Sequence, residues 1–226
     1  MTKTKLSFTE RLTLGYVLLV VLIAFALFFF HPSSLDIYLE EDGIVEWLTV
    51  IGLVAGFIVC ISRFFKLLKL KSWWFLTITL VLGLLLFMAA GEEISWGQRI
   101  LGIKSSEYFL KHNAQGETNL HNLVVNGVKI NKLIFSTILI AVLAIYLAIL
   151  PILYKTNKAI KNFLDKSGVP VPKPYQILSF LLLFGLSQLL KHDRNSELLE
   201  CGFAALFFLV IYFPLNKEVF EPEQKD

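Results

Sequence analysis

The chain has 226 residues, of which 56% are hydrophobic and only 17% charged, with a formal net charge of +3. Soluble domains carry about 25% charged residues, so this composition excludes an ordinary soluble protein and indicates one embedded in a membrane. The basic residues follow the membrane topology predicted below, which excludes nucleic acid as a partner and leaves membrane lipid.

Six apolar segments, taken in chain order, predict an all-α bundle of about six transmembrane helices. Four contain apolar runs long enough to cross the hydrocarbon core, for which a helix needs roughly 20 residues. The last two runs have only sixteen residues, so the fifth helix should extend toward His192 and the sixth should begin near Glu197. The predicted spans are residues 12–30, 44–64, 73–92, 133–153, 175–192 and 197–215. They form one transmembrane domain over residues 1–215, followed by a disordered cytoplasmic tail over residues 216–226.

The loops between these spans differ in charge. Loops on the side of the two termini hold 14 Lys and Arg, against 7 in the opposite loops. Because cytoplasmic loops carry the excess of basic residues, both termini are predicted to face the cytoplasm. The outer side, with its helix mouths, carries twelve of the eighteen Asp and Glu and all four His. The sequence thus predicts a polar outer end, covered by short amphipathic helices in the loop 91–132.

The stretch GEEISWGQRI (91–100) begins where the third apolar segment ends. If the third helix continues, Glu92, Ser95 and Arg99 share one face at i, i+3 and i+7, while Glu93 points to a neighbouring stripe. Arg99 or Gln98 would then orient Glu92, and one of the two carboxylates would serve as a ligand or base. The alternative is that these groups form only the polar mouth of a membrane helix.

A second group of polar residues, QGETNLHN (115–122), lies in the same outer loop. A short helix here would place Glu117 and His121 at i and i+4 on one face. That spacing suits two ligands of one metal, or a carboxylate that orients an imidazole; an ion pair or a helix cap fits it too. Because the loop joins the third and fourth spans, it should lie over the acidic helix mouths. We therefore expect Glu92 to contact this segment or Glu197–Glu200.

Carboxylates and imidazoles on several helices predict a metal site at this outer end. Carboxylates at membrane depth are costly and face the protein interior or a wet cavity, so they are functional candidates, and Glu46 in the second span is one of them. Such a mixed set of ligands suits Zn²⁺, Mn²⁺ or a carboxylate-bridged iron site. The candidate metal ligands are Glu92, Glu117, His121, His192, Glu197 and Glu200.

Two stretches, GEEISWGQRILGI (91–103) and NAQGETNLHNL (113–123), resemble the hallmark of a family of bacterial multi-pass membrane proteins. This resemblance implies the bacterial cytoplasmic membrane and brings no known activity. A third stretch, DIYLEEDGIVEWLTVIGLVAGF (36–57), is similar to the start of alkaline ceramidases and related membrane hydrolases. That similarity implies a lipid amide or ester as substrate and a metal held by three His and an acid. Where those hydrolases have a late His-x-x-x-His pair, this chain has His192, Glu197 and Glu200.

Three functions remain open from the sequence. The first is a metal-dependent hydrolase or transferase directed at lipid. The second is a small-solute or proton-coupled carrier, although the inner halves of the spans contain no carboxylate and no His. The third is a structural or assembly protein, in which the acids are interfacial residues. The oligomeric state does not follow from the sequence.

The hydrolase hypothesis assigns a role to each outer residue. Glu92 is the metal ligand or general base, with Glu93 beside it, and Glu117 and His121 are ligand and orienting partner. Arg99 holds an anionic headgroup or a developing oxyanion. The assignment rests on chemistry: a base needs a buried carboxylate, and a charged headgroup needs a fixed cation.

Overall fold

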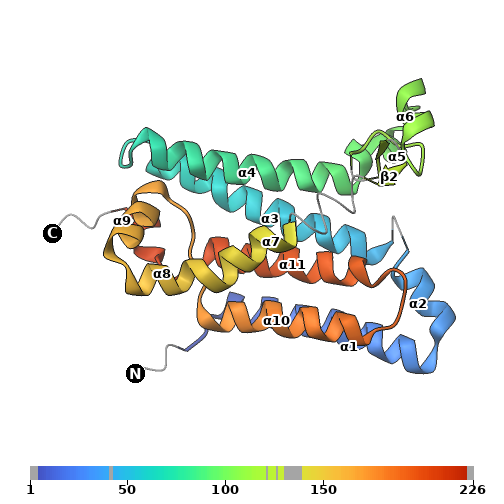
Figure 1. Cartoon of the computed structure of the whole chain (residues 1–226), viewed down its shortest axis with the longest axis horizontal. Coiled ribbons are helices and arrows are strands. Elements are labelled where there is room, and N and C mark those ends of the chain that lie inside the picture. The colour runs from blue at the N-terminus through green and yellow to red at the C-terminus, as the bar shows by residue number, and fades with distance from the viewer. Residues whose placement is uncertain (1–4, 41–42, 121, 126, 130–138, 223–226) are drawn as a thin grey trace.

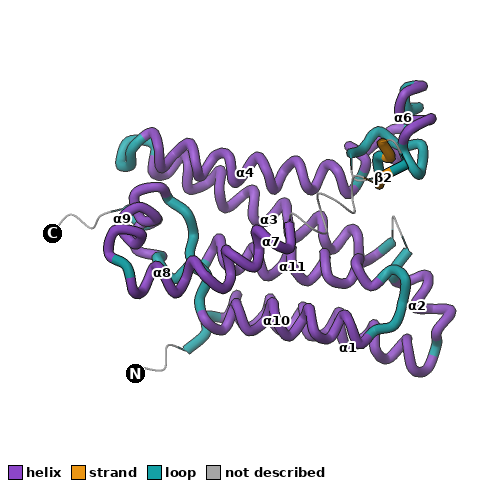
Figure 2. The backbone as a smooth tube through the Cα atoms, in the orientation of Figure 1, coloured by secondary structure: helices purple, strands orange, loops and turns teal. Residues whose placement is uncertain are grey.

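The structure, a computed structural model, describes residues 5–40, 43–120, 122–125, 127–129 and 139–222. Most of the described residues are helical. The described residues are all-α apart from one small hairpin (Figure 1, Figure 2). The all-α prediction is confirmed, and so is the presence of several helices apolar enough to cross a membrane.

Four of the described helices are long and apolar enough to cross a membrane by length and composition. They are α1 (Phe8–Phe30), α3 (Ile44–Leu67), α4 (Trp73–Glu93) and α11 (Asn195–Tyr212). A fifth is added if Ala141–Thr156 and Lys158–Ser167 count as one broken span. The chain bends by 116° between these two helical stretches. This stretch comprises α7 (Leu139–Ala144), the π-helical η3 (Ile145–Ile149), α8 (Leu150–Thr156) and α9 (Lys158–Ser167). The apolar α10 (Pro174–Leu189) is shorter, with 16 residues.

Most helix boundaries lie close to the predicted ones. The ends of α1, α3, α4 and α11 all fall within four residues of the predicted spans. Helix α10 ends at Leu189, three residues before the predicted end, and does not reach His192. One of its last carbonyls, that of Ser187, instead accepts a hydrogen bond from Asn195 Nδ2 at 3.3 Å. Residues 133–138 of the predicted fourth span lie outside the described residues.

Side chains at the helix starts account for several of these boundaries. Ser7 caps α1 in a capping box: its hydroxyl accepts the Glu10 N–H, and the Glu10 carboxylate accepts the Ser7 N–H. Ser72 accepts the Phe75 N–H at the start of α4. Asn157 does the same for two N–H groups of α9. Each cap satisfies backbone donors that a helix start otherwise leaves without a partner.

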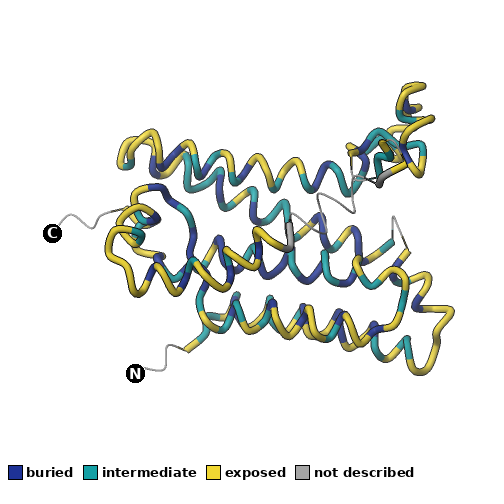
Figure 3. Tube along the Cα trace, viewed as in Figure 1, coloured by how far each residue is buried: buried dark blue, intermediate teal, exposed yellow. Residues whose placement is uncertain are grey.

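The long helices lie side by side in the order α4, α3, α11 and then the α1–α10 pair (Figure 1). Helix α11 contacts α1, α3 and α10 and is the most buried of the four long helices. Small residues permit this close approach: a Cβ on Gly202 would clash with Leu183, and one on Gly52 would lie 3.0 Å from Ala204. Many apolar residues of the long helices are exposed, as expected where lipid replaces water. Figure 3 shows exposed positions recurring along α4 and α10.

One end of the bundle carries the segment that follows α4. It contains η1 (Ser95–Gly97), α5 (Gln98–Leu101), α6 (Glu107–His112) and an antiparallel hairpin of β1 (Val124–Val125) and β2 (Val128–Lys129). Helix α2 (Pro32–Tyr38) lies at the same end (Figure 1). Short helices are predicted in this loop, and α5 and α6 are present, but many of the described residues around them form turns, bends and irregular backbone.

The C-terminal segment differs from its predicted disorder. Residues 217–220 form a short 3-10 helix, η4 (Lys217–Phe220), and Phe220 is buried. Its ring packs against Phe75 of α4 with centroids 5.4 Å apart, and Arg63 of α3 lies 4.2 Å above it. This buried aromatic anchors an otherwise polar segment, whose last four residues, 223–226, lie outside the described residues.

Candidate functional site

A left-handed turn ends α4 and sets the direction of the segment that follows it. Ser95, Trp96 and Gly97 have φ values of 46°, 56° and 72°, so the predicted continuation of the third helix through Arg99 is wrong. Left-handed backbone costs a bulky residue ~1–3 kcal/mol and persists only where the surroundings enforce it. Here the indole of Trp96 folds back over Gly91, where a Cβ would lie 2.8 Å from the ring. Glycine at position 91 therefore makes room for this turn.

Glu92 holds the returning chain in place. Its Oε1 accepts the indole N–H of Trp96 at 2.9 Å, and its Oε2 accepts the backbone N–H of Leu120. The second contact confirms the expectation that Glu92 touches the segment that begins at Glu117. It is a backbone contact, and the predicted partner Arg99 pairs elsewhere.

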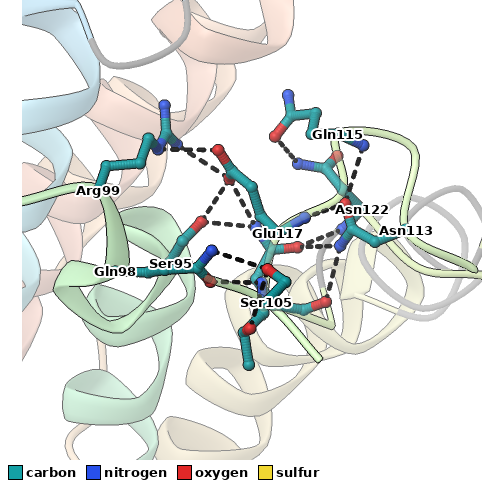
Figure 4. A network of polar contacts seen from close by, with 10 residues as sticks. Ser95, Gln98, Arg99, Ser105, Asn113, Gln115, Glu117 and Asn122 are labelled. Atoms are coloured by element: carbon teal, nitrogen blue, oxygen red, sulfur yellow. Dashed lines mark hydrogen bonds and ion pairs between the residues drawn. The ribbon is translucent and has the colours of Figure 1, made fainter. Parts of the chain in front are cut away.

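Glu117 is the centre of a polar network between the turn and the 113–122 segment (Figure 4). Arg99 binds both of its oxygens, with Nε 2.9 Å from Oε1 and an Nη 3.1 Å from Oε2. Ser95, whose side chain is completely buried, donates to Glu117 Oε2 at 2.6 Å and accepts from Asn119 Nδ2 at 2.8 Å. A fork-shaped pair of this kind fixes the carboxylate in direction as well as in place.

Gln98 also links the turn after α4 to the 113–122 segment (Figure 4). Its carbonyl oxygen accepts the Thr118 N–H at 2.8 Å, and its amide donates to Ser105 Oγ at 2.7 Å. The Thr118 hydroxyl donates to the same Ser105 oxygen at 3.2 Å. Residues from three separate stretches are thus joined by their side chains and by one backbone N–H.

Asparagine amides fold the 113–122 segment on itself. Asn113 Oδ1 accepts the N–H groups of Gln115 and Glu117, and its amide donates to the Asn119 carbonyl at 3.0 Å. Asn122 donates its backbone N–H to Asn119 Oδ1 and its side-chain amide to Gln115 Oε1 at 2.7 Å. We call residues 95–120, together with Asn122, the polar lid.

The lid is not helical where the sequence predicted a helix. Residues 117–120 form bends and irregular backbone, so the i, i+4 argument for Glu117 and His121 fails. Asn113 supplies the hydrogen-bond partners that a helix would have given to Gln115 and Glu117. His121 lies outside the described residues.

Beneath the lid is a polar cavity of about 20 Å³. Roughly 10–15 Å³ of this kind of volume is enough for one water molecule, so the cavity accommodates one water or one small cation. Its carboxylates come from three helices: α3, α4 and α11. The lining residues are Glu46, Glu92, Glu93, Glu197, Arg99, Gln115, Asn119 and Asn122.

Negative charge is concentrated in this cavity. Glu93 interacts electrostatically with Glu197, Glu46 and Glu92, and Glu46 is only 6% exposed. Carboxylates removed from water repel one another unless a base, a shared proton or a bound cation balances them. Arg99 also lines the cavity, where it binds Glu117 through two of its nitrogens. Four carboxylates from three helices thus share one small cavity with this guanidinium.

The structure brings together some of the predicted site residues and separates others. Glu92, Glu93, Arg99 and Glu197 line the cavity, and Glu117 joins it through Arg99. His192 does not: its Nε2 lies 2.9 Å from Asp36 Oδ1 of α2. Glu200, one turn beyond Glu197 on α11, is also outside the lining. Among the described residues, no three His, Cys, Asp or Glu side chains are already arranged around a metal position.

The lid amides were missed as site residues by sequence reasoning. Asn119 is 3% exposed and bonds to three other lid side chains, and Asn113 is also buried. The available signal was the density of amides, with Asn113, Gln115, Asn119 and Asn122 within ten residues. Buried amides require several hydrogen-bond partners, so such a run indicates a segment that folds on its own polar side chains.

Comparisons with protein-family models, with curated proteins and with solved structures found no match. The carboxylate cavity and the polar lid are the features of the described residues that bear on function.

Proposed function

We propose that the chain is a multi-pass protein of the bacterial cytoplasmic membrane, with six crossings, cytoplasmic termini and the polar lid outside. The basic helix α9 lies at the end of the bundle opposite the lid (Figure 1), which is the distribution of positive charge that cytoplasmic loops carry. Helix α10 and the α7–α8 stretch would supply the two crossings beyond the four long helices.

At its outer end, the protein binds one small cation between the carboxylates of Glu46, Glu92, Glu93 and Glu197. The observation that carries this proposal is that four acids from three helices line one cavity of about 20 Å³. Oxygen ligands of this kind suit Mn²⁺, and an imidazole added to them would suit Zn²⁺ or iron. His121, between two described lid residues, is the further ligand that the sequence offers.

The reaction we propose is hydrolysis or group transfer on a lipid amide or ester beside the headgroup. A bound cation supplies polarisation of the carbonyl and activation of water. Glu93 or Glu92 accepts the proton, since both face the space that holds the water. The cavity is too small for a headgroup, so the lid must shift to admit one. Arg99 binds an anionic headgroup only if Glu117 releases it.

A non-catalytic role is the second candidate, and the lid itself favours it. Its amides, hydroxyls and Arg99 are engaged with other parts of the chain. Among the described residues, every buried side-chain N or O has a hydrogen-bond partner. A network of this kind stabilises a structure whether or not any substrate is bound.

Metal analysis of the purified protein and a lipid comparison of cells test the proposal together. We expect about one transition metal per chain in the native protein, lost in Glu93→Gln and Glu197→Gln and kept in Glu107→Gln. Glu107 is an exposed acid of the same outer loop and serves as the matched control. Cells lacking the protein should accumulate a lipid that the native protein and Glu107→Gln remove and Glu93→Gln does not. If the purified protein contains no metal and Glu93→Gln restores normal lipids in cells, the catalytic proposal is wrong and the structural role remains.

Labelling of introduced cysteines tests the orientation separately. Glu107→Cys should react with an impermeant thiol reagent in intact cells, while Lys161→Cys on α9 should react only after permeabilisation. The native Cys60 and Cys201 are buried and leave a low background. Labelling of both positions from the same side would reject the proposed topology.

A further inference from the structure

A second cavity, of about 500 Å³, lies at the end of the bundle opposite the lid. It is formed where α3 and α11 end and where the C-terminal segment folds against them. Its size falls within the range of roughly 300–1,000 Å³ that is usual for small-ligand pockets. The lining residues are Ile58, Val59, Ser62, Arg63, Lys66, Tyr212, Phe213, Lys217, Phe220, Glu221 and Pro222.

The wall formed by α3 changes from apolar to basic along the helix. Ile58, Ser62 and Lys66 stand at i, i+4 and i+8 on one face. Ile58 is 58% exposed, so the cavity opens onto the apolar surface that α3 presents to lipid. We call this open cavity the groove. A ligand in the groove therefore has an apolar part deep in the bilayer and a polar part near the end of the helix.

The charges at the end of the groove favour an anion. Three bases, Arg63, Lys66 and Lys217, face a single acid, Glu221. Lys217 Nζ lies 2.8 Å from Glu221 Oε1, whereas Lys66 has no ion pair with any described residue.

Arg63 is held firmly in place beside these groups. Its guanidinium donates to the carbonyls of Ile211 and Tyr212, the last residues of α11, and stacks on Phe220. The charge of Arg63 is thus fixed in the lining of the groove, which Lys66 and Lys217 share.

We propose that this groove binds an anionic phospholipid from the leaflet at this end of the bundle. The phosphate lies between Lys66, Lys217 and the Ser62 hydroxyl, and one acyl chain follows Ile58 and Val59. The apolar wall, continuous with the lipid-facing surface of α3, selects a phospholipid over free phosphate. Bound lipid would join α3 to the C-terminal segment, which contributes Lys217 and Phe220.

Native mass spectrometry of the full chain in detergent tests this site, with phosphatidylglycerol and phosphatidylcholine as probes. We expect phosphatidylglycerol to bind more tightly, and Lys66→Gln and Lys217→Gln each to weaken it about five-fold, from ~1 kcal/mol per basic residue near a membrane surface. Lys69→Gln is the matched control, because Lys69 is exposed one turn from Lys66 and outside the groove. Glu221→Gln should strengthen binding, a gain that misfolding cannot produce.

Three outcomes would overturn the inference. The first is equal binding of the two lipids. The second is an effect of Lys69→Gln as large as that of Lys66→Gln, together with no gain in Glu221→Gln. The third is complete displacement of phosphatidylglycerol by millimolar inorganic phosphate, because the apolar wall would then contribute nothing and the groove would be a site for free anions.

Discussion

Arg99 and Glu117, eighteen residues apart in the chain, form a two-pronged ion pair at the edge of the carboxylate cavity. The Nε–Oε1 distance is 2.9 Å and the Nη–Oε2 distance is 3.1 Å. Arg99 follows the left-handed turn after α4, and Glu117 belongs to the segment that crosses above the helix mouths. The pair therefore fastens the two halves of the lid to each other.

Replacing Arg99 by Lys should loosen the lid without unfolding the bundle. Lys keeps the charge and loses the planar fork that contacts both oxygens. The side chains are 34% and 14% exposed, so we expect a cost of about 1 kcal/mol. Hydrogen exchange of residues 113–120 should become faster, while exchange in α3 and α11 stays unchanged. Arg194→Lys, at an exposed arginine of another outer loop, is the control; identical exchange in all three proteins would mean that the pair does not hold the lid.

Asn119→Asp should damage the lid more than Arg99→Lys. The substitution keeps the shape and replaces an amide that donates to Ser95 and Glu117 with a second carboxylate beside Glu117. A buried donor lost in this way costs about 2–3 kcal/mol, and repulsion adds to that cost. Limited proteolysis should then cut the lid in native membranes. Asn162→Asp, on the exposed face of α9, should remain resistant. Equal resistance of the two variants would refute the central role of Asn119.

Gly91→Ala tests the packing that permits the left-handed turn. The new methyl group would lie 2.8–2.9 Å from three ring atoms of Trp96, and overpacking of this kind costs about 1–3 kcal/mol. The melting temperature should fall, although alanine favours a helix. Gly15→Ala on α1 is the matched control, since nothing lies within 4 Å of its Cβ, and it should be neutral or stabilising by up to about 1 kcal/mol. A Gly91→Ala protein as stable as Gly15→Ala would show that Trp96 can move at no cost.

Metal removal should affect the native protein and the Glu93→Gln variant differently, a prediction that rests on the proposed cation site. A cation present at 100 times its Kd stabilises the folded state by about 2.7 kcal/mol, so chelation should lower the melting temperature of the native protein. In Glu93→Gln the loss of one ligand weakens binding, and chelation should change little. Without cation, Glu93→Gln should be at least as stable as the native protein, because one repelling charge is gone. The same shift on chelation in both proteins would rule out Glu93 as a ligand.

Much of the helical framework follows from the sequence alone. The apolar runs predicted α1, α3, α4 and α11 to within four residues, because run length and helix rise decide whether a segment spans the hydrocarbon core. The two polar stretches around Glu92 and Glu117 were also expected to meet. Since they flank one loop at one end of the bundle, connectivity alone brings them close.

Only the tertiary structure decided which polar groups pair. The turn at Ser95–Gly97 depends on the space above Gly91, and Arg99, which follows it, binds Glu117. His192 binds Asp36, while Glu197 joins Glu46 and Glu93 across three helices. The C-terminal segment is held by the buried ring of Phe220 and by the hydrogen bonds of Asn216 to Val169 and Val171. Composition and periodicity describe residues that are neighbours along the chain. These contacts depend instead on the path of the backbone through a non-helical loop, and on residues distant in sequence that pack against that loop.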